Sequence, residues 1–258
     1  MQLVRGVTLA LSSGGARGFS HIGVLKSLER HHIPVLGIAG SSMGGLIGAL
    51  YCCGYTAQKL EELAGGLRRS QWIDFSLSKM GMVRGHKLLE LMERLTENRT
   101  FEELSLPLKL VAVDIQRGEE VVLDSGSVAE AVRATTSIPG IFSPVVRGDE
   151  ILVDGGVLNR VPVDLARQIA EAPVIAVDAG LDISPVVKSV FDILFQAFDV
   201  VARELRRYKP VQADVLIEPY LPNARDAQFT KVGEFVRAGE TACEAKISDI
   251  LGRLEGSA

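Results

Sequence analysis

Short apolar runs alternating with stretches of helical periodicity constrain the fold of this chain more than any other feature of its sequence. Each run is short enough to be one buried strand, and most of the intervals between runs can hold a helix. The runs are residues 7–11, 35–39, 108–113, 151–153, 174–177 and 215–217. Repeated βαβ units of this kind predict an α/β fold in which helices pack on a mostly parallel sheet.

Glycine-rich segments follow the first two predicted strands, and an apolar stripe comes directly after each of them. Stripes with this spacing predict two amphipathic helices. Their residues are Ile22, Leu25 and Leu28 in the first, and Met43, Leu46, Ile47 and Leu50 in the second. Further along, the Gly-Asp pair at 148–149 lies between the apolar residues 145–146 and 151–152. This arrangement predicts a tight hairpin, so part of the sheet is expected to be antiparallel.

The length and composition suit one domain spanning residues 1–258. No linker, repeat or low-complexity tract divides the chain. Hydrophobic residues make up 47% of it and aromatic residues only 5%, which suits helices packed closely on a sheet. The 28 basic and 32 acidic residues are spread along the chain and leave a formal net charge of −4. A basic surface for nucleic acid is therefore excluded.

The cysteines and the apolar segments bear on location. Cys52, Cys53 and Cys243 have no metal-ligand spacing and predict buried thiols in a reducing compartment, with no metal site. The N-terminal residues lack the pattern of a secretory signal, so a cytoplasmic protein is expected. Charged residues interrupt the longest apolar-rich segment, residues 186–201, which argues against a membrane span. Peripheral membrane contact and homo-oligomerisation stay open.

Residues 40–44 (GSSMG) match the G-x-S-x-G pattern of a nucleophile elbow, between a predicted strand and a predicted helix. Such a turn holds its central residue, Ser42, in a sparsely allowed backbone conformation, and Gly40 and Gly44 prevent clashes around it. The helix that follows directs its positive N-terminal end at Ser42. Ser42 is therefore the candidate nucleophile. The alternative is a tight strand-to-helix turn without a catalytic role.

Residues 12–18 (SSGGARG) follow the first strand and open the first helix, so several backbone N–H groups should converge on one point. Fixed donors of this kind stabilise the negative charge that develops on a carbonyl oxygen during acyl transfer. A dinucleotide fingerprint fails because Ala16 replaces its second glycine and no carboxylate ends the second strand. An oxyanion hole is favoured, with a phosphate-binding loop or a purely structural loop as alternatives.

A serine hydroxyl needs a neighbouring base before it becomes a good nucleophile. The four histidines are His21, His31, His32 and His86, all in the first third of the chain. Their positions exclude a triad in which the histidine follows the serine and the acid. His21 lies beside the glycine loop and stays open as a base, although a histidine on a helix surface is the commoner explanation.

Carboxylates at strand ends are the other candidates for the base: Asp114, Asp154 and Asp178. Asp154 is followed by Gly155 and Gly156, which let the backbone turn beside the carboxylate and leave room for a substrate. Asp154 is therefore preferred. Asp114 and Asp178 could instead cap helices or accept hydrogen bonds from loop amides.

Three separated segments, residues 14–18, 40–44 and 154–156, resemble the motifs of the patatin-like phospholipases in order and spacing. A fourth block, residues 134–144 (ATTSIPGIFSP), resembles the stretch that precedes the aspartate motif of that family. Ser41 stands where many members carry Thr or Ala. The likeness covers a motif-bearing core at about residues 5–180 and fades in a helical C-terminal part at about 181–258.

The resemblance implies a three-layer α/β/α patatin-like fold and a Ser–Asp dyad that needs no histidine, metal or cofactor. In that dyad Ser42 is the nucleophile and Asp154 the base, while Gly14, Gly15 and Ala16, with help from Arg17, surround the oxyanion. The implied reaction is hydrolysis of an acyl ester in a lipid, as by a phospholipase A or lysophospholipase. A lipid-binding or regulatory module with little turnover, and an acyltransferase or thioesterase using the same dyad, are the alternatives.

Two segments admit more than one interpretation. Residues 65–87 carry large apolar side chains among glycines and basic residues, as either a lid or a surface excursion that caps the core would. In residues 186–205 polar residues recur every three or four positions and leave a wide apolar face. The polar set is Lys188, Asp192, Gln196, Asp199 and Arg203, and the apolar face includes Phe191, Leu194, Phe195 and Phe198. Core packing is favoured for that face, with a subunit interface or a lipid-entry surface as alternatives.

Overall fold

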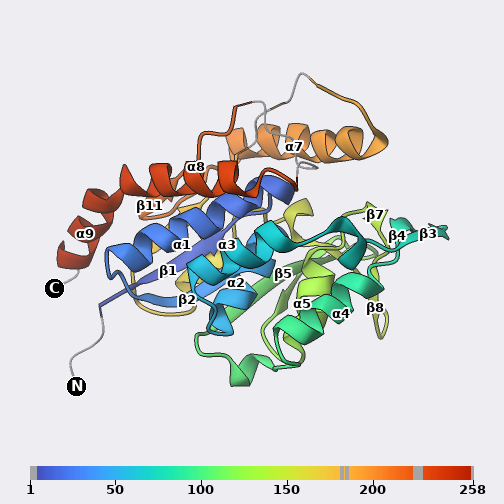
Figure 1. Ribbon diagram of the computed structural model, residues 1–258, viewed down its shortest axis with the longest axis horizontal. Helices are drawn as coiled ribbons and strands as arrows, with labels where there is room; N and C mark the ends of the chain where they lie inside the picture. The colour runs from blue at the N-terminus through green and yellow to red at the C-terminus, as the bar shows by residue number, and fades with distance from the viewer. Residues whose placement is uncertain (1–4, 181–182, 184–185, 223–228, 257–258) are drawn as a thin grey trace.

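A computed structural model describes residues 5–180, 183, 186–222 and 229–256 of the chain (Figure 1). The two chain ends, and the expected start of the C-terminal part at residue 181, lie outside the described residues. Within them a central sheet is flanked by helices, as the alternating pattern predicts. No described helix is both long and apolar enough to cross a membrane.

All six apolar runs form strands of the central sheet. Its order is β11-β10-β1-β2-β5-β9-β8, and β6 also pairs with β5. The first five strands of this order are parallel, whereas β6, β8 and β9 run antiparallel to their partners. The strands are β1 (Val7–Leu11), β2 (Val35–Ser41), β5 (Leu108–Asp114), β6 (Glu119–Leu123), β8 (Val145–Arg147), β9 (Glu150–Asp154), β10 (Val174–Val177) and β11 (Val215–Ile217).

The predicted hairpin is confirmed. β8 and β9 pair in antiparallel register, with Arg147 opposite Glu150. Gly148, in the two-residue connection between them, has a φ of 61°, a conformation that glycine adopts without strain. The hairpin extends the antiparallel part of the sheet, and its second strand ends at Asp154.

The two faces of the sheet are covered unequally. Alternate strand residues such as Leu9 and Leu11 point into the larger core, which is covered by α1, α2, α5 and α8. Ala10 and Ala39 point into a smaller core under α6. The helices are α1 (Ser20–Arg30), α2 (Met43–Cys52), α3 (Ala57–Gly66), α4 (His86–Leu95), α5 (Val128–Thr135), α6 (Val163–Arg167), α7 (Val190–Tyr208), α8 (Val232–Glu244) and α9 (Ile247–Gly256). The third layer of the α/β/α fold is thus thin, because α6 has only five residues.

One register detail brings two distant parts of the chain together. β6 occupies one edge of β5 along Leu110–Asp114. On the opposite edge of β5, residues Leu108–Val111 pair with β2, and residues Ala112–Asp114 pair with β9. Because β2 and β9 run in opposite directions, their C-terminal ends meet end to end beside the middle of β5. The residues that follow β2 and end β9 are Ser42 and Asp154.

Residues 65–87 contain regular secondary structure and pack partly against the core. They contain the strands β3 (Phe75–Ser78) and β4 (Gly81–Val83), which build a small sheet with β7 (Gly140–Phe142). Trp72 and Met82 pack against the core, and the Trp72 ring lies 4.9 Å from that of Phe229. Phe75 and Met80 are exposed. The segment therefore caps the core in part, as the surface-excursion interpretation expects.

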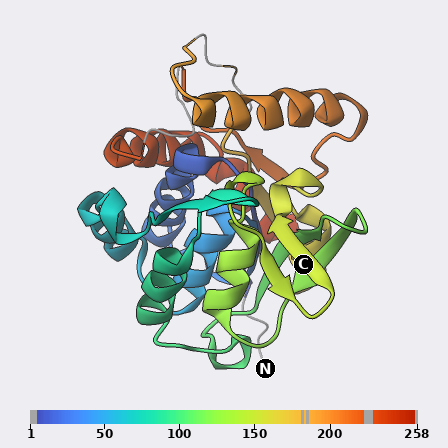
Figure 2. The same cartoon turned by 90° about the vertical axis from the view of Figure 1, so that its right-hand side faces the viewer.

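The interpretation of residues 186–205 is wrong in one respect. The helix is α7, and the polar residues Asp192 and Asp199 were expected on its solvent face. Both are buried, while Val190 and Ile193 are more than half exposed. Figures 1 and 2 show α7 as the outermost helix, lying across one end of the molecule. Phe191, Leu194 and Phe195 do pack against the core, as expected.

Candidate active site

Ser42 occupies the sharp turn between β2 and α2. Its φ of 53° and ψ of −123° are rare for a residue with a side chain, as expected at a nucleophile elbow. The turn is held by the Ser42 N–H, which donates to the Thr135 hydroxyl at 3.0 Å, and that hydroxyl donates in turn to the Val111 carbonyl oxygen. Ser42 itself is only 5% exposed.

The elbow glycines leave no room for side chains. A Cβ on Gly40 would come within 2.6 Å of the Gly45 Cα, and one on Gly44 within 2.4 Å of the Leu11 carbonyl oxygen. Both contacts are with backbone, which moves less readily than the end of a side chain. These glycines let α2 start directly against β1 and β2, and α2 therefore directs its positive end at Ser42.

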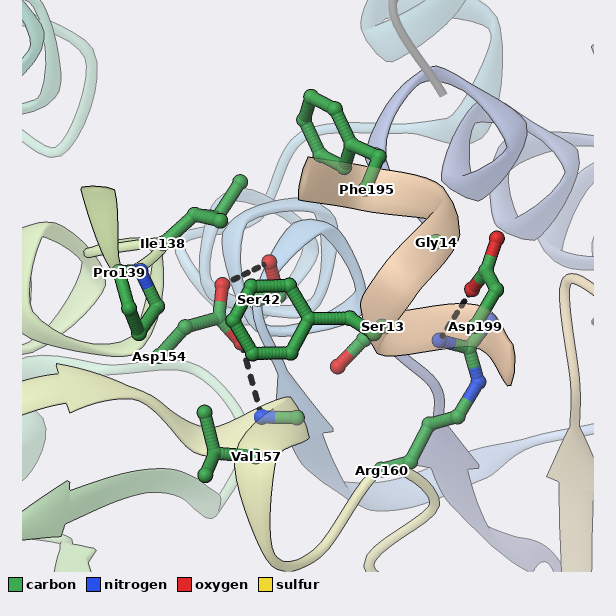
Figure 3. A pocket seen from close by; sticks show the side chains of 13 residues that line it. Ser13, Gly14, Ser42, Ile138, Pro139, Asp154, Val157, Arg160, Phe195 and Asp199 are labelled. Atoms are coloured by element: carbon green, nitrogen blue, oxygen red, sulfur yellow. Dashed lines mark hydrogen bonds and ion pairs between the residues drawn. The ribbon is translucent and has the colours of Figure 1, made fainter. Parts of the chain in front are cut away.

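Asp154 lies next to Ser42 although 112 residues separate them in sequence. The Ser42 hydroxyl donates to Asp154 Oδ2 at 2.5 Å, and the Gly156 N–H donates to Oδ1 at 2.8 Å (Figure 3). A Cβ on Gly155 would come within 2.3 Å of the Val111 carbonyl oxygen, so only glycine allows the turn after β9 to lie so close to β5. A Cβ on Gly156 would come within 2.3 Å of the Ser13 Oγ.

Burial changes the acidity of Asp154. The residue is 5% exposed, and desolvation of its charged form raises the pKa of Asp154 from 3.8 to about 6. The hydrogen bonds from Ser42 and Gly156 lower the pKa, as does the charge of Arg160, but they offset the desolvation only in part. The carboxyl group is therefore ionised at neutral pH and accepts a proton more readily than an exposed aspartate.

The glycine-rich loop lies against the same pocket. Gly14 and Gly15 line it, and the short helix η1 (Gly15–Phe19) begins there and leads into α1. The first N–H groups of a helix have no acceptor within the helix, and η1 begins at Gly15 on the pocket wall. Ala16 is fully buried, and its side chain packs in the core.

Arg17 makes contacts that its place in the loop sequence does not reveal. Its N–H donates to the Gly14 carbonyl oxygen at 3.0 Å, which closes the first turn of η1. Its guanidinium group is almost fully buried and lies 2.5 Å from Asp199 Oδ2 of α7. The side chain thus links the glycine-rich loop to the outermost helix.

The pocket encloses about 410 Å³, a volume that includes the solvent at its open mouth. Figure 3 shows the apolar residues Ile138, Pro139 and Val157 around Asp154, and Arg160 next to Asp199. The pocket is lined by Ser13, Gly14, Gly15, Ser42, Ile138, Pro139, Asp154, Gly156, Val157, Arg160, Phe195, Phe198 and Asp199. Apolar walls beside a serine hydroxyl suit a ligand with an apolar chain.

Buried ion pairs join α7 to the floor of the pocket. Besides its contact with Arg17, Asp199 lies with its Oδ1 3.4 Å from Arg160 Nη1. Arg160 donates to the Gly180 carbonyl oxygen at 2.7 Å and lies 3.7 Å from Asp178. Asp178 in turn lies 2.8 Å from Arg206, near the C-terminal end of α7. The carboxylates of Asp178 and Asp199 and three guanidinium groups therefore form one connected network, which the exposed Glu218 extends at Arg206.

The other candidates for the base are engaged elsewhere. Asp114 pairs with Arg117 and accepts the Gln116 N–H, and Asp178 belongs to the ion-pair network. His21 is not on a helix surface, contrary to expectation, but fully buried. Its Nε2 lies 2.8 Å from the Ser12 carbonyl oxygen and must donate to it, and burial lowers the pKa of His21 to about 4. A neutral ring held in this way is not positioned as a base for Ser42.

Sequence reasoning missed three residues of the site. Thr135 lies in the block resembling the family, but nothing in its sequence context predicts its contact with Ser42. Arg160 follows the aspartate motif without a recognisable pattern. Asp199 was assigned to a solvent-facing stripe, since a single charged residue at helical spacing usually is exposed.

Comparison with known proteins identifies the family of the chain. Residues 9–167, more than half of the chain, match the patatin-like phospholipase family model. An uncharacterized NTE family protein of Mycobacterium tuberculosis is 34% identical over 184 residues, which cover 69% of this chain and 48% of that protein. Patatin-like phospholipase domain-containing protein 6 of Homo sapiens is 34% identical over 182 residues, covering 67% of this chain and 13% of that protein. The chain thus spans less than half the length of either relative.

The fold has a neighbour among solved structures. The crystal structure of VipD from Legionella pneumophila superimposes with a TM-score of 0.62, at 14% sequence identity, covering 96% of this chain and 67% of that one. At this identity the similarity concerns the fold alone. It supports the assignment of the mostly parallel sheet with flanking helices.

Proposed function

The chain belongs to the patatin-like phospholipase family, and from that premise we propose that it hydrolyses acyl esters of lipids with Ser42 as nucleophile and Asp154 as base. Family membership implies lipid acyl hydrolase activity. The finer assignment rests on one observation, the 2.5 Å hydrogen bond from the Ser42 hydroxyl to a buried carboxylate beside an apolar pocket. No other acid or histidine among the candidates lies in that position.

In the acylation step Ser42 Oγ attacks the ester carbonyl carbon while its proton passes to Asp154 Oδ2. The tetrahedral intermediate then expels the alcohol, and Asp154 returns the proton to the leaving oxygen. The pKa of about 6 suits this exchange, because a base is most effective when its pKa is near the working pH. The Gly156 N–H keeps the carboxylate oriented toward Ser42 throughout.

In this mechanism the glycine-rich loop stabilises the negative charge that develops on the carbonyl oxygen of the substrate. Gly14 and Gly15 line the pocket that also contains Ser42, and Gly14, Gly15 and Ala16 supply peptide N–H groups at the start of η1. Arg17 contributes only its positive charge in this scheme, because its N–H and guanidinium group are engaged with Gly14 and Asp199. Donors fixed in this way need no rearrangement when the charge appears.

Deacylation repeats the chemistry with water as the nucleophile. Asp154 accepts a proton from water, the resulting hydroxide attacks the acyl carbon, and Ser42 Oγ leaves with that proton. The acyl chain lies against Ile138, Phe195 and Phe198, where burial of its CH₂ groups contributes to binding. A phospholipase A or lysophospholipase is the substrate class that we propose.

A lipid extract incubated with wild-type protein and with Ser42→Ala tests this function. We expect free fatty acid and the matching deacylated lipid only with the wild type, and a loss of p-nitrophenyl butyrate turnover of at least about 10⁴-fold in Ser42→Ala. Ser105→Ala is the matched control, since Ser105 is exposed, does not line the pocket and should leave activity unchanged. Acyl transfer to an added alcohol in preference to water would identify an acyltransferase, and the absence of any ester turnover would contradict the proposal.

A further inference from the structure

The outer surface of α7 is unusually apolar for a helix at the edge of a protein. Among the described residues seventeen large apolar side chains are exposed, and eight of them lie within residues 186–208. Six belong to α7 itself and recur at helical spacing: Val190, Ile193, Val200, Val201, Leu205 and Tyr208. We call these six the α7 outer face. Exposed apolar surface concentrated in one place is typical of a binding surface.

The inner face of α7 fixes this orientation. Phe195 and Phe198 line the catalytic pocket, and Asp199 and Arg206 are held by the ion-pair network. Asp192 is buried because its carboxylate accepts the Lys188 N–H and the Ser189 hydroxyl at the start of the helix. Rotating α7 to bury the outer face would break the ion pairs of Asp199 and Arg206 and remove Phe195 and Phe198 from the pocket. The α7 outer face therefore stays exposed to solvent in the folded chain.

Basic residues flank the outer face. Lys188, Arg203, Arg207 and Lys209 are exposed, against one exposed acid, Glu204, between residues 186 and 209. Arg207 pairs with Glu204 at the surface, where such a pair is weak. This local excess of positive charge contrasts with a chain whose net charge is −4. A helix with an apolar face and basic flanks is typical of one that lies in an anionic lipid interface.

We propose that the α7 outer face docks the protein on an anionic lipid bilayer, which brings the substrate to Ser42. This rests on the proposed function, because a lipid substrate must reach the pocket from a membrane or a micelle. The pocket lies on the opposite side of the same helix, so the docked bilayer is about 10 Å from the pocket, one helix diameter. A phospholipid drawn past the edge of α7 spans that distance.

The test uses vesicles of phosphatidylcholine alone and of phosphatidylcholine mixed with phosphatidylglycerol. Binding is measured by co-sedimentation in a Ser42→Ala background, so that the vesicles stay intact. The docking variant is Ile193→Gln with Val201→Gln, both more than half exposed and outside the pocket. The matched control is Val122→Gln with Val146→Gln, two exposed valines of β6 and β8. If the first pair fails to fold, Val190→Gln with Leu205→Gln replaces it.

We expect the parent protein to bind the anionic vesicles more tightly than the neutral ones, with binding weakened by salt. The docking variant should lose at least about tenfold in partitioning, and the control should stay within about twofold. In the active background the docking variant should hydrolyse p-nitrophenyl butyrate as the wild type does. Equal vesicle binding by docking and control variants would overturn the proposal.

Two further outcomes separate this proposal from others. If light scattering shows an oligomer that the docking variant dissociates, a second copy covers the outer face and the lipid assignment is wrong. If no variant cleaves any ester but the docking variant alone loses vesicle binding, the docking surface stands and the proposed catalytic function fails. The two failures are therefore distinguishable.

Discussion

At Asp154, the contact with Ser42 requires burial, whereas the charge of the carboxylate favours exposure to water. The carboxylate must be buried to meet Ser42 inside an apolar pocket, and burial disfavours its charge. Only two hydrogen bonds and the charge of Arg160 offset that cost. We infer that the buried, ionised Asp154 lowers the free energy of unfolding at neutral pH, and that the same burial makes this carboxylate a better proton acceptor.

Asp154→Asn should therefore abolish ester hydrolysis and yet raise the free energy of unfolding. The folded-state pKa, about 6, lies above the unfolded value of 3.8, so ionisation opposes folding as the pH rises between these values. The gain should be about 2 to 3 kcal/mol above pH 7 and should fall below about 1 kcal/mol at pH 4, where Asp154 is protonated in the folded state and about half protonated in the unfolded state. Urea denaturation of both proteins from pH 4 to 8 measures it, and a gain independent of pH would contradict the account.

Secondary-structure elements bring these residues together through the shared edge of β5. β2 and β9 meet end to end there, so the nucleophile and the base are placed by strand register rather than by flexible loops. Neighbouring glycines make this close approach possible. Each apolar run was recognisable from sequence as a strand, but the sharing of one edge was not, because pairing is decided between segments far apart in the chain.

Gly155→Ala tests the importance of this junction. The new Cβ would contact the Val111 carbonyl oxygen at 2.3 Å and push the end of β9 away from β5. We expect hydrolysis of p-nitrophenyl butyrate to fall at least about 100-fold, since small displacements of catalytic groups are costly. Gly65→Ala, in α3 with open space around it, is the matched control and should leave activity unchanged. Retention of full activity by Gly155→Ala would show that the close approach is not needed.

In the molecule as a whole, the candidate site lies where β2 and β9 end beside β5, and buried ion pairs hold the helix α7 against the same pocket. The ion pair between Arg17 and Asp199 joins residues 182 positions apart. Polarity patterns in sequence assume that charged side chains face solvent, and α7 departs from this assumption. The motifs around Ser42 and Asp154 were predictable because each is local, whereas Arg160, Asp199 and the orientation of α7 depend on the assembled fold.

Asp199→Asn measures how firmly α7 is held. Removing one partner of a buried ion pair leaves the remaining charges poorly compensated, so we expect a loss of about 3 kcal/mol in the free energy of unfolding. Glu204→Gln, which removes only the surface pair with Arg207, should change stability by less than about 0.5 kcal/mol. Urea denaturation at neutral pH compares them, and equal effects of the two substitutions would refute the fastening role.

The central claim, that Asp154 activates the Ser42 hydroxyl, is tested most directly by labelling with a fluorophosphonate and locating the adduct by peptide mass spectrometry. The account predicts an adduct on Ser42 whose rate of formation falls as the pH drops through about 6, and a rate at least about 10³-fold slower in Asp154→Asn. An adduct on another residue, or equal labelling rates in the wild type and Asp154→Asn, would contradict it.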